Sequence, residues 1–264
     1  MTIENIIPIL IILFFGLPHG AADILIAKRL LNNKYKYIFY FFIIYSLIAI
    51  IFSIIWLIIP IISLVFFLII SVSHFGLLDT HKTNKLPYRN IRAILYGFTP
   101  IIIPVVFHTS EVNILFSLLL FSNSIELSSF IIPIFPIWLT GNLIFLISGG
   151  VDTKIEFLEI SLLASILIIL PPLWGFATYF CLIHSMRHSR NVINKLGYLS
   201  KSDLMALSGI ITLSLTVIFL GAYLITTNNF GESLIRLTFI SLGSLTIPHI
   251  ILIDLYKGLN RIKV

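Results

Sequence analysis

The chain of 264 residues is too apolar for a soluble protein, with 58% hydrophobic and 11% charged residues and a mean hydropathy of +1.08. Such a composition cannot cover a water-facing surface with polar groups, which excludes a soluble enzyme and a disordered protein. The net charge of +6 does not indicate nucleic-acid binding, because the basic residues lie in short clusters between long apolar runs. Membrane lipid is therefore the predicted surrounding of most of the chain.

The first apolar run, Ile3–Ala27, is predicted to be a membrane span. Its beginning has no basic leader and contains Glu4, so we do not expect a cleaved signal peptide. A helix needs about 20 apolar residues to cross the hydrocarbon core. Five further runs meet this requirement: Tyr37–Ile59, Ile61–Leu78, Ile91–Phe107, Leu204–Thr226 and Leu234–Leu255.

The stretch from Asn113 to His188 is harder to divide, because proline and glycine pairs interrupt it. We expect spans at Asn113–Ile131 and Ile132–Ser148 and a long, kinked helix at Glu156–His188. The sequence thus predicts an all-α, polytopic integral membrane helix bundle with about seven to nine transmembrane helices. Residues 1–264 are expected to form a single integral membrane domain.

The basic residues predict the orientation of the spans in the cell membrane. All but two of the 17 Lys and Arg fall in four clusters, which are Lys28, Arg29, Lys34 and Lys36; Lys82, Lys85, Arg89 and Arg92; Arg187, Arg190, Lys195 and Lys201; and Lys257, Arg261 and Lys263. Cytoplasmic loops of membrane proteins carry an excess of Lys and Arg. With all four clusters in the cytoplasm, the N-terminus lies outside and the C-terminus inside.

Five of the seven histidines share one predicted depth in the membrane. His81 lies beside Lys82 in a predicted loop and His108 at the outer end of a span, and both are interpreted as solvated or interfacial rings. The others each precede a cytoplasmic charge cluster, on four different spans, and an ionisable ring inside a membrane needs a partner. These five are His19, His74, His184, His188 and His249. His184 and His188 are four residues apart, so on an α-helix they would project from one face as a pair of metal ligands.

Imidazole is a ligand for iron, copper, nickel and zinc, and the single cysteine, Cys181, excludes a multi-Cys zinc site. Liganded histidines usually donate their second ring N–H to a carboxylate. Asp23 lies at helical spacing from His19, whereas Asp79 and Asp254 follow their histidines by five residues and would more naturally serve another helix or the membrane boundary. The alternative is that the buried rings bond backbone carbonyls, including those released by Pro18 and Pro248.

Four sequence blocks in order resemble a known family: Gly16–Asp23 (GLPHGAAD), Ser71–Asp79 (SVSHFGLLD), His184–His188 (HSMRH) and Pro248–His249. Together they are similar to the Brp/Blh family of integral membrane β-carotene 15,15'-dioxygenases, over residues 16 to about 254. The chain departs from the pattern at Leu77 and Leu78 after His-Phe-Gly and at Ile24 after Asp23, where some relatives carry polar residues.

The resemblance implies an all-helical enzyme that holds non-haem Fe²⁺ and adds O2 across the central double bond of β-carotene to give two retinal molecules. By matching blocks, His19, His74, His184 and His188 would be the iron ligands and the catalytic residues. His249 would be a further ligand, a neighbour of the ligands or a residue of the substrate channel. Asp23 and Asp79 are expected, from their positions after the histidines, to be partners of the rings. Retinal would pass to a microbial rhodopsin, and neither nucleic acid nor a further cofactor is implied.

Other functions place histidines in similar positions. A membrane fatty-acyl or sterol desaturase or hydroxylase also has histidine-rich helix ends, but its two-metal site needs more histidines than the five here. A haem-binding anchor or a metal transporter uses paired histidines on different spans, although a transporter more often has mid-membrane carboxylates and internal repeats. A rhodopsin is disfavoured, because no lysine lies deep in a predicted span.

Overall fold

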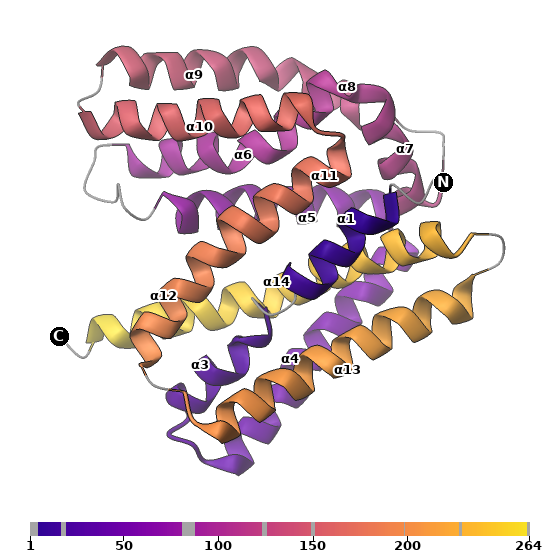
Figure 1. The fold of residues 1–264 in the computed structure, drawn as a ribbon, viewed down its shortest axis with the longest axis vertical. Coiled ribbons are helices and arrows are strands. Elements are labelled where there is room, and N and C mark those ends of the chain that lie inside the picture. The colour runs from indigo at the N-terminus through magenta and orange to yellow at the C-terminus, as the bar shows by residue number, and fades with distance from the viewer. Residues whose placement is uncertain are drawn as a thin grey trace. The chain divides into compact units, whose positions relative to one another are not determined.

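The structure is a computed structural model that describes residues 5–16, 20–80, 88–122, 126–148, 151–197, 199–226 and 229–262. Every regular element within these ranges is a helix (Figure 1), which confirms the predicted all-α class. A helix satisfies its backbone hydrogen bonds within one segment, as a chain in lipid requires.

The lengths and compositions of the helices fit the predicted membrane bundle. Six helices in the described ranges are long and apolar enough to cross a bilayer, and two shorter apolar helices cover Ile6–Gly16 and Thr109–Leu120. The six are Tyr35–Ile58, Pro60–Asp79, Arg89–Phe107, Ser128–Ile147, Lys201–Ile225 and Phe230–Ile253. Five of them match predicted spans closely, because each span is one apolar run between charged or helix-breaking residues.

The chain divides into two compact units, which we call unit 1 (Met1–Ser63 with Ser185–Val264) and unit 2 (Leu64–His184). Unit 1 contains α1 (Ile6–Ile11), the π-helix η2 (Ile12–Gly16), α3 (Asp23–Leu30), α4 (Tyr35–Ile58), α12 (Met186–Leu196), α13 (Lys201–Ile225) and α14 (Phe230–Ile262). Helix α14 packs against α3, α4 and α13. The Ser53 and Ser244 hydroxyls, 2.8 Å apart, join α4 to α14.

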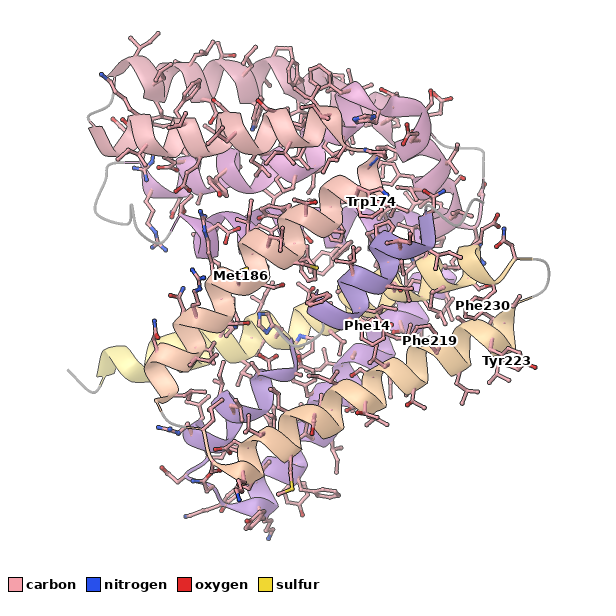
Figure 2. The ribbon with its side chains drawn as sticks, in the orientation of Figure 1. Phe14, Trp174, Met186, Phe219, Tyr223 and Phe230 are labelled. Carbon is pink, nitrogen blue, oxygen red and sulfur yellow. The ribbon has the colours of Figure 1, made fainter. Side chains whose placement is uncertain are left out.

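One face of α13 is apolar and unburied. Leu213, Val217, Leu220 and Leu224 recur at helical spacing and are between 54% and 71% exposed. Tyr223, labelled on α13 in Figure 2, is 71% exposed. An apolar helix face of this kind fits contact with lipid rather than with water.

Unit 2 contains most of α5 (Pro60–Asp79), then α6 (Arg89–Phe107), α7 (Thr109–Leu120), α8 (Ser128–Ile131), the 3₁₀ helix η4 (Ile132–Ile134), α9 (Phe135–Ser148), α10 (Val151–Ile169), α11 (Pro172–Ala177) and the π-helix η5 (Thr178–Ser185), whose last residue belongs to unit 1. Helix α6 packs against both α9 and α10 (Figure 1). The Trp138 indole N–H donates to the Leu95 carbonyl at 2.9 Å. Between α6 and α10, Arg92 and Glu156 form a buried ion pair at 3.0 Å.

Glycines allow α5 and α6 to meet backbone to backbone. A Cβ atom added to Gly76 would overlap the carbonyl oxygen of Ala93, and one added to Gly97 would overlap that of Val72. Gly76 lies two residues after His74 and three before Asp79. The small residue beside this histidine is therefore required for helix approach.

The structure differs from the sequence prediction in the stretch between residues 113 and 188. The predicted span Asn113–Ile131 is not one helix, since α7 ends at Leu120 and Phe121 is left-handed with φ 56°. The predicted span Ile132–Ser148 instead continues from α8 through η4. The predicted helix Glu156–His188 is broken rather than kinked, because Pro171 is extended (φ −53°, ψ 151°) before Pro172, which begins α11.

The predicted first span, Ile3–Ala27, is also divided. Helix α1 continues as η2 to Gly16, and α3 begins only at Asp23. Residues 17–19 lie outside the described ranges. Within the described residues, Ala22 forms a turn directly before α3.

Candidate functional site

Two predicted ligands in unit 2, His74 and His184, lie against each other. His74 is in the last turns of α5, and His184 is near the end of η5. Their ring centroids are 5.1 Å apart with an interplanar angle of 63°. His184 is fully buried at 0% exposure, with Phe75 against its edge at 4.6 Å and Phe180 stacked on it at 5.9 Å.

A carboxylate and a tyrosine adjoin His184. The Asp79 Oδ2 atom is 3.4 Å from the His184 Nδ1 atom. The Tyr179 hydroxyl donates a 2.7 Å hydrogen bond to the same Oδ2. A carboxylate facing Nδ1 favours the tautomer with its proton there, which leaves the lone pair on Nε2 for a ligand. We call Tyr179, Asp79 and His184 the unit 2 triad.

Two other predicted residues, His188 and His249, form the corresponding pair in unit 1. His188 is in the first turn of α12, and His249 directly follows Pro248 within α14. Their ring centroids are 5.2 Å apart at an interplanar angle of 62°, and both residues are buried. Each unit thus holds two imidazoles at nearly the same separation.

His249 has the same kinds of partners as His184. Its Nδ1 atom lies 2.8 and 2.9 Å from the two carboxylate oxygens of Asp23, in the first turn of α3. The Tyr45 hydroxyl, from α4, donates a 2.8 Å hydrogen bond to Asp23 Oδ2. We call Tyr45, Asp23 and His249 the unit 1 triad.

The two tyrosines are the residues that sequence reasoning does not identify. Tyr45 is 22 residues from Asp23, and Tyr179 is 100 residues from Asp79. Both lie in apolar runs where tyrosine also serves ordinary packing, so no local pattern singles them out. Spacing pairs Asp23 with His19, yet the structure places it on His249, 226 residues away.

Some of the residues singled out in the sequence lie outside the described part of the chain. His19 and His81 are not described, and the side chain of Asp254 is not described either. His108 is at the end of α6, where its Nε2 atom is 2.9 Å from the Ile168 carbonyl oxygen. His184 and His188 do not share one regular α-helix, because η5 ends at Ser185 and α12 begins at Met186.

The ring separations fit imidazoles that share a metal ion. With metal–nitrogen bonds of about 2.1 Å and ligand angles of about 90–110°, two ring centroids would be about 4.5–5.3 Å apart. Edge-to-face aromatic pairs reach similar distances without a metal, so the carboxylates on Nδ1 are the more specific feature. Within the described ranges, no group of three His, Cys, Asp or Glu side chains is arranged around one metal position.

Comparisons with known proteins agree over nearly the whole chain. The profile of one protein family, described as beta-carotene 15,15'-dioxygenase, matches residues 10–257. The chain is 34% identical over 255 residues to a beta-carotene 15,15'-dioxygenase of an uncultured marine bacterium, 66A03, with 92% of this chain and 90% of the relative covered. No solved structure matches the chain.

Proposed function

Because the chain belongs to the beta-carotene 15,15'-dioxygenase family, we propose that it cleaves β-carotene at the central double bond with O2 to form two molecules of retinal. The carbon–carbon double bond and the O–O bond both break, and each aldehyde receives one oxygen atom. The reaction balances without an external reductant. The observation that carries this proposal is the match of family and relative across both units, including all the described histidine blocks.

We propose Fe²⁺ as the cofactor, held by His19, His74, His184 and His188. The structural support comes from the buried side chains of unit 2, in which His184 faces a carboxylate and the His74 and His184 rings have a separation suited to a shared ion. Neutral imidazoles leave a bound Fe²⁺ its positive charge and, below six ligands, a position for O2. A polyene offers no acidic proton, so no general acid or base is needed.

The residues around the His184 ring would hold it in position and keep water away from it. Asp79 and Tyr179 hold His184 in one orientation, and Phe75 and Phe180 cover it with apolar surface. An apolar, water-poor surrounding suits a hydrocarbon substrate that is dissolved in lipid. β-Carotene is about as long as the hydrocarbon core is thick, near 30 Å, and would enter from the membrane.

The proposed location is the cell membrane, with several passes, an outside N-terminus and a cytoplasmic C-terminus, as the basic clusters favour. Retinal formed in the bilayer would be delivered within the same lipid phase, and a microbial rhodopsin is the proposed recipient. Cysteine scanning of the loops with a membrane-impermeant reagent tests the orientation.

The function is tested in a bacterial host that accumulates β-carotene. Membranes from cells that express the chain should contain retinal, whereas those with the His74→Ala variant at equal protein level should contain none. His108→Ala is the matched control, because this ring lies at the end of α6 against the Ile168 carbonyl of α10 and belongs to neither pair. Unchanged β-carotene beside folded, iron-loaded protein would contradict the proposed substrate.

Metal analysis of the purified protein separates this function from the other functions considered above. One iron per chain supports the dioxygenase, two support a desaturase or hydroxylase, and a Soret band indicates haem. The iron content of His249→Ala decides the role of that residue. Loss of iron would identify His249 as a ligand, and retention of iron would show that it only packs against His188.

A further inference from the structure

Each unit contains one Tyr–Asp–His triad, and the two triads share the same order of contacts. A tyrosine hydroxyl donates to an aspartate, at 2.8 Å for Tyr45 and 2.7 Å for Tyr179. The aspartate faces the Nδ1 atom of a histidine, at 2.8 Å for His249 and 3.4 Å for His184. Because the same contacts occur in two separately packed units, we attribute them to a need of the histidine rings for a fixed carboxylate partner rather than to chance packing.

The burial of the aspartates explains why a hydroxyl donor is needed. Asp23 is 2% exposed and Asp79 is 6% exposed. A carboxylate in such a place needs hydrogen-bond donors to offset its lost hydration. A tyrosine hydroxyl supplies one donor from a rigid side chain and fixes the carboxylate orientation, while other acceptor positions remain for the ring N–H.

In the unit 2 triad the helix type itself supports this interpretation. Tyr179 and His184 are five residues apart within η5. In an α-helix, residues five apart differ by about 140° around the axis. The i→i+5 hydrogen bonding of a π-helix instead brings such residues to the same side on successive turns. The π-helix therefore lets both side chains reach Asp79.

We propose that Tyr45 and Tyr179 are positioning residues that fix the tautomer and ring orientation of His249 and His184 through Asp23 and Asp79. With the proton held on Nδ1, the lone pair of each ring lies on Nε2, and the Nε2 of His184 would face the proposed Fe²⁺. Neither tyrosine needs to touch the substrate or the metal. For its relation to iron, this inference rests on the proposed function.

The test uses Tyr179→Phe and Tyr45→Phe in the full-length protein, since each removes one hydroxyl and keeps the ring. Tyr96→Phe is the control, because Tyr96 is a buried tyrosine of α6 outside both triads. In metal-free protein with ¹⁵N-labelled histidine, the wild type should show Nδ1-protonated signals for His184 and His249. These signals are assigned with the His184→Gln and His249→Gln variants.

Each Tyr→Phe substitution should convert only its own histidine signal to a mixture of tautomers. The retention of Fe²⁺ against a chelator should fall about 10-fold in Tyr179→Phe, as expected when a partner of a liganded histidine is lost. The kcat should fall while the KM for β-carotene stays unchanged. If the tyrosine acts through Asp79, Tyr179→Phe should have no further effect in an Asp79→Asn background.

The possible failures are distinguishable. Unchanged tautomers in both tyrosine variants, or an additive effect on Fe²⁺ retention in the double variant, would overturn the positioning role. A wild type that binds no iron, but whose tautomers respond to the substitutions, would contradict the proposed function and leave the positioning role intact. Because the triads lie in different units, one variant that fails to fold still leaves the other as a test.

Discussion

The triads of unit 1 and unit 2 reach the same contacts by different constructions. The unit 1 triad takes one residue from each of three α-helices, and its aspartate faces the histidine with both oxygens at 2.8 and 2.9 Å. The unit 2 triad takes two residues from one π-helix, and its aspartate is 3.4 Å from the histidine. The two triads thus share their three side-chain types and the order of their contacts, although the helices that carry them differ.

The largest effects are expected at the histidines, one from each unit. His184→Ala and His188→Ala should each reduce both bound iron and retinal formation to background, because each would remove a proposed ligand. Iron content and retinal are measured in the same membranes. A double variant that stays loaded with iron and active would refute the ligand assignment.

The ion pairs of the two units should differ strongly in their effect on stability. Arg92 and Glu156 in unit 2 are 2% and 7% exposed, whereas Lys28 and Asp203 in unit 1 are 19% and 23% exposed. Glu156→Ala should lower the free energy of unfolding by about 3–5 kcal/mol, since it leaves a buried charge. Lys28→Ala should lower it by about 1 kcal/mol or less. Thermal unfolding in detergent measures both, and equal shifts would contradict this difference in burial.

The glycines allow a similar comparison. Gly76→Ala should destabilise the protein by about 1–3 kcal/mol or more, because the added methyl group overlaps the Ala93 carbonyl oxygen. Retinal formation should fall with it, since α5 carries His74 and Asp79. Gly209→Ala in α13 is the control, because its Cβ meets nothing within 4 Å, and it should stabilise the helix by up to about 1 kcal/mol. A neutral Gly76→Ala would show that α5 and α6 can separate without loss.

The aspartates compare the two triads directly. Asp79→Asn should lower Fe²⁺ retention about 10–100-fold, because it removes the carboxylate from a proposed ligand, His184. Asp23→Asn should lower retention less, because its partner His249 lies beside His188 rather than in the proposed ligand set. Chelator competition gives both values. An equal or larger effect of Asp23→Asn would assign His249 as a ligand.

The sequence is sufficient for the helices whose apolar runs end at strong signals. The Ile59–Pro60 boundary between α4 and α5 follows from proline, which is accepted at the first position of a helix. The break before Pro172 is expected only as a kink, because sequence alone does not tell whether neighbouring helices would support the chain through a double proline. The turn at Phe121 is not predictable, since nothing marks a phenylalanine for left-handed backbone.

The candidate site is predictable as residue types and not as pairs. The shared membrane depth of the histidines stays a prediction, whereas the structure shows His74, His184, His188 and His249 buried. The aspartate partners depend on which helices pack together, and α3 packs against α14, which places Asp23 on His249. The tyrosines depend on the same packing, so only the structure could show them.

The π-helix η5 relates the unit 2 triad to the number of residues in its segment. A segment with i→i+5 hydrogen bonds contains one more residue per turn than an α-helix can accommodate in register. Deleting one residue between Tyr179 and His184, such as the 62% exposed Leu182, would allow the segment to return to α-helix. Tyr179 and His184 would then be four residues apart in the count of the shortened chain, and residues at this spacing still share one face of an α-helix. A spacing of five residues on a π-helix and a spacing of four on an α-helix are therefore equivalent ways to place this tyrosine and histidine together, and related chains that lack one residue in this segment should keep the pair at a spacing of four.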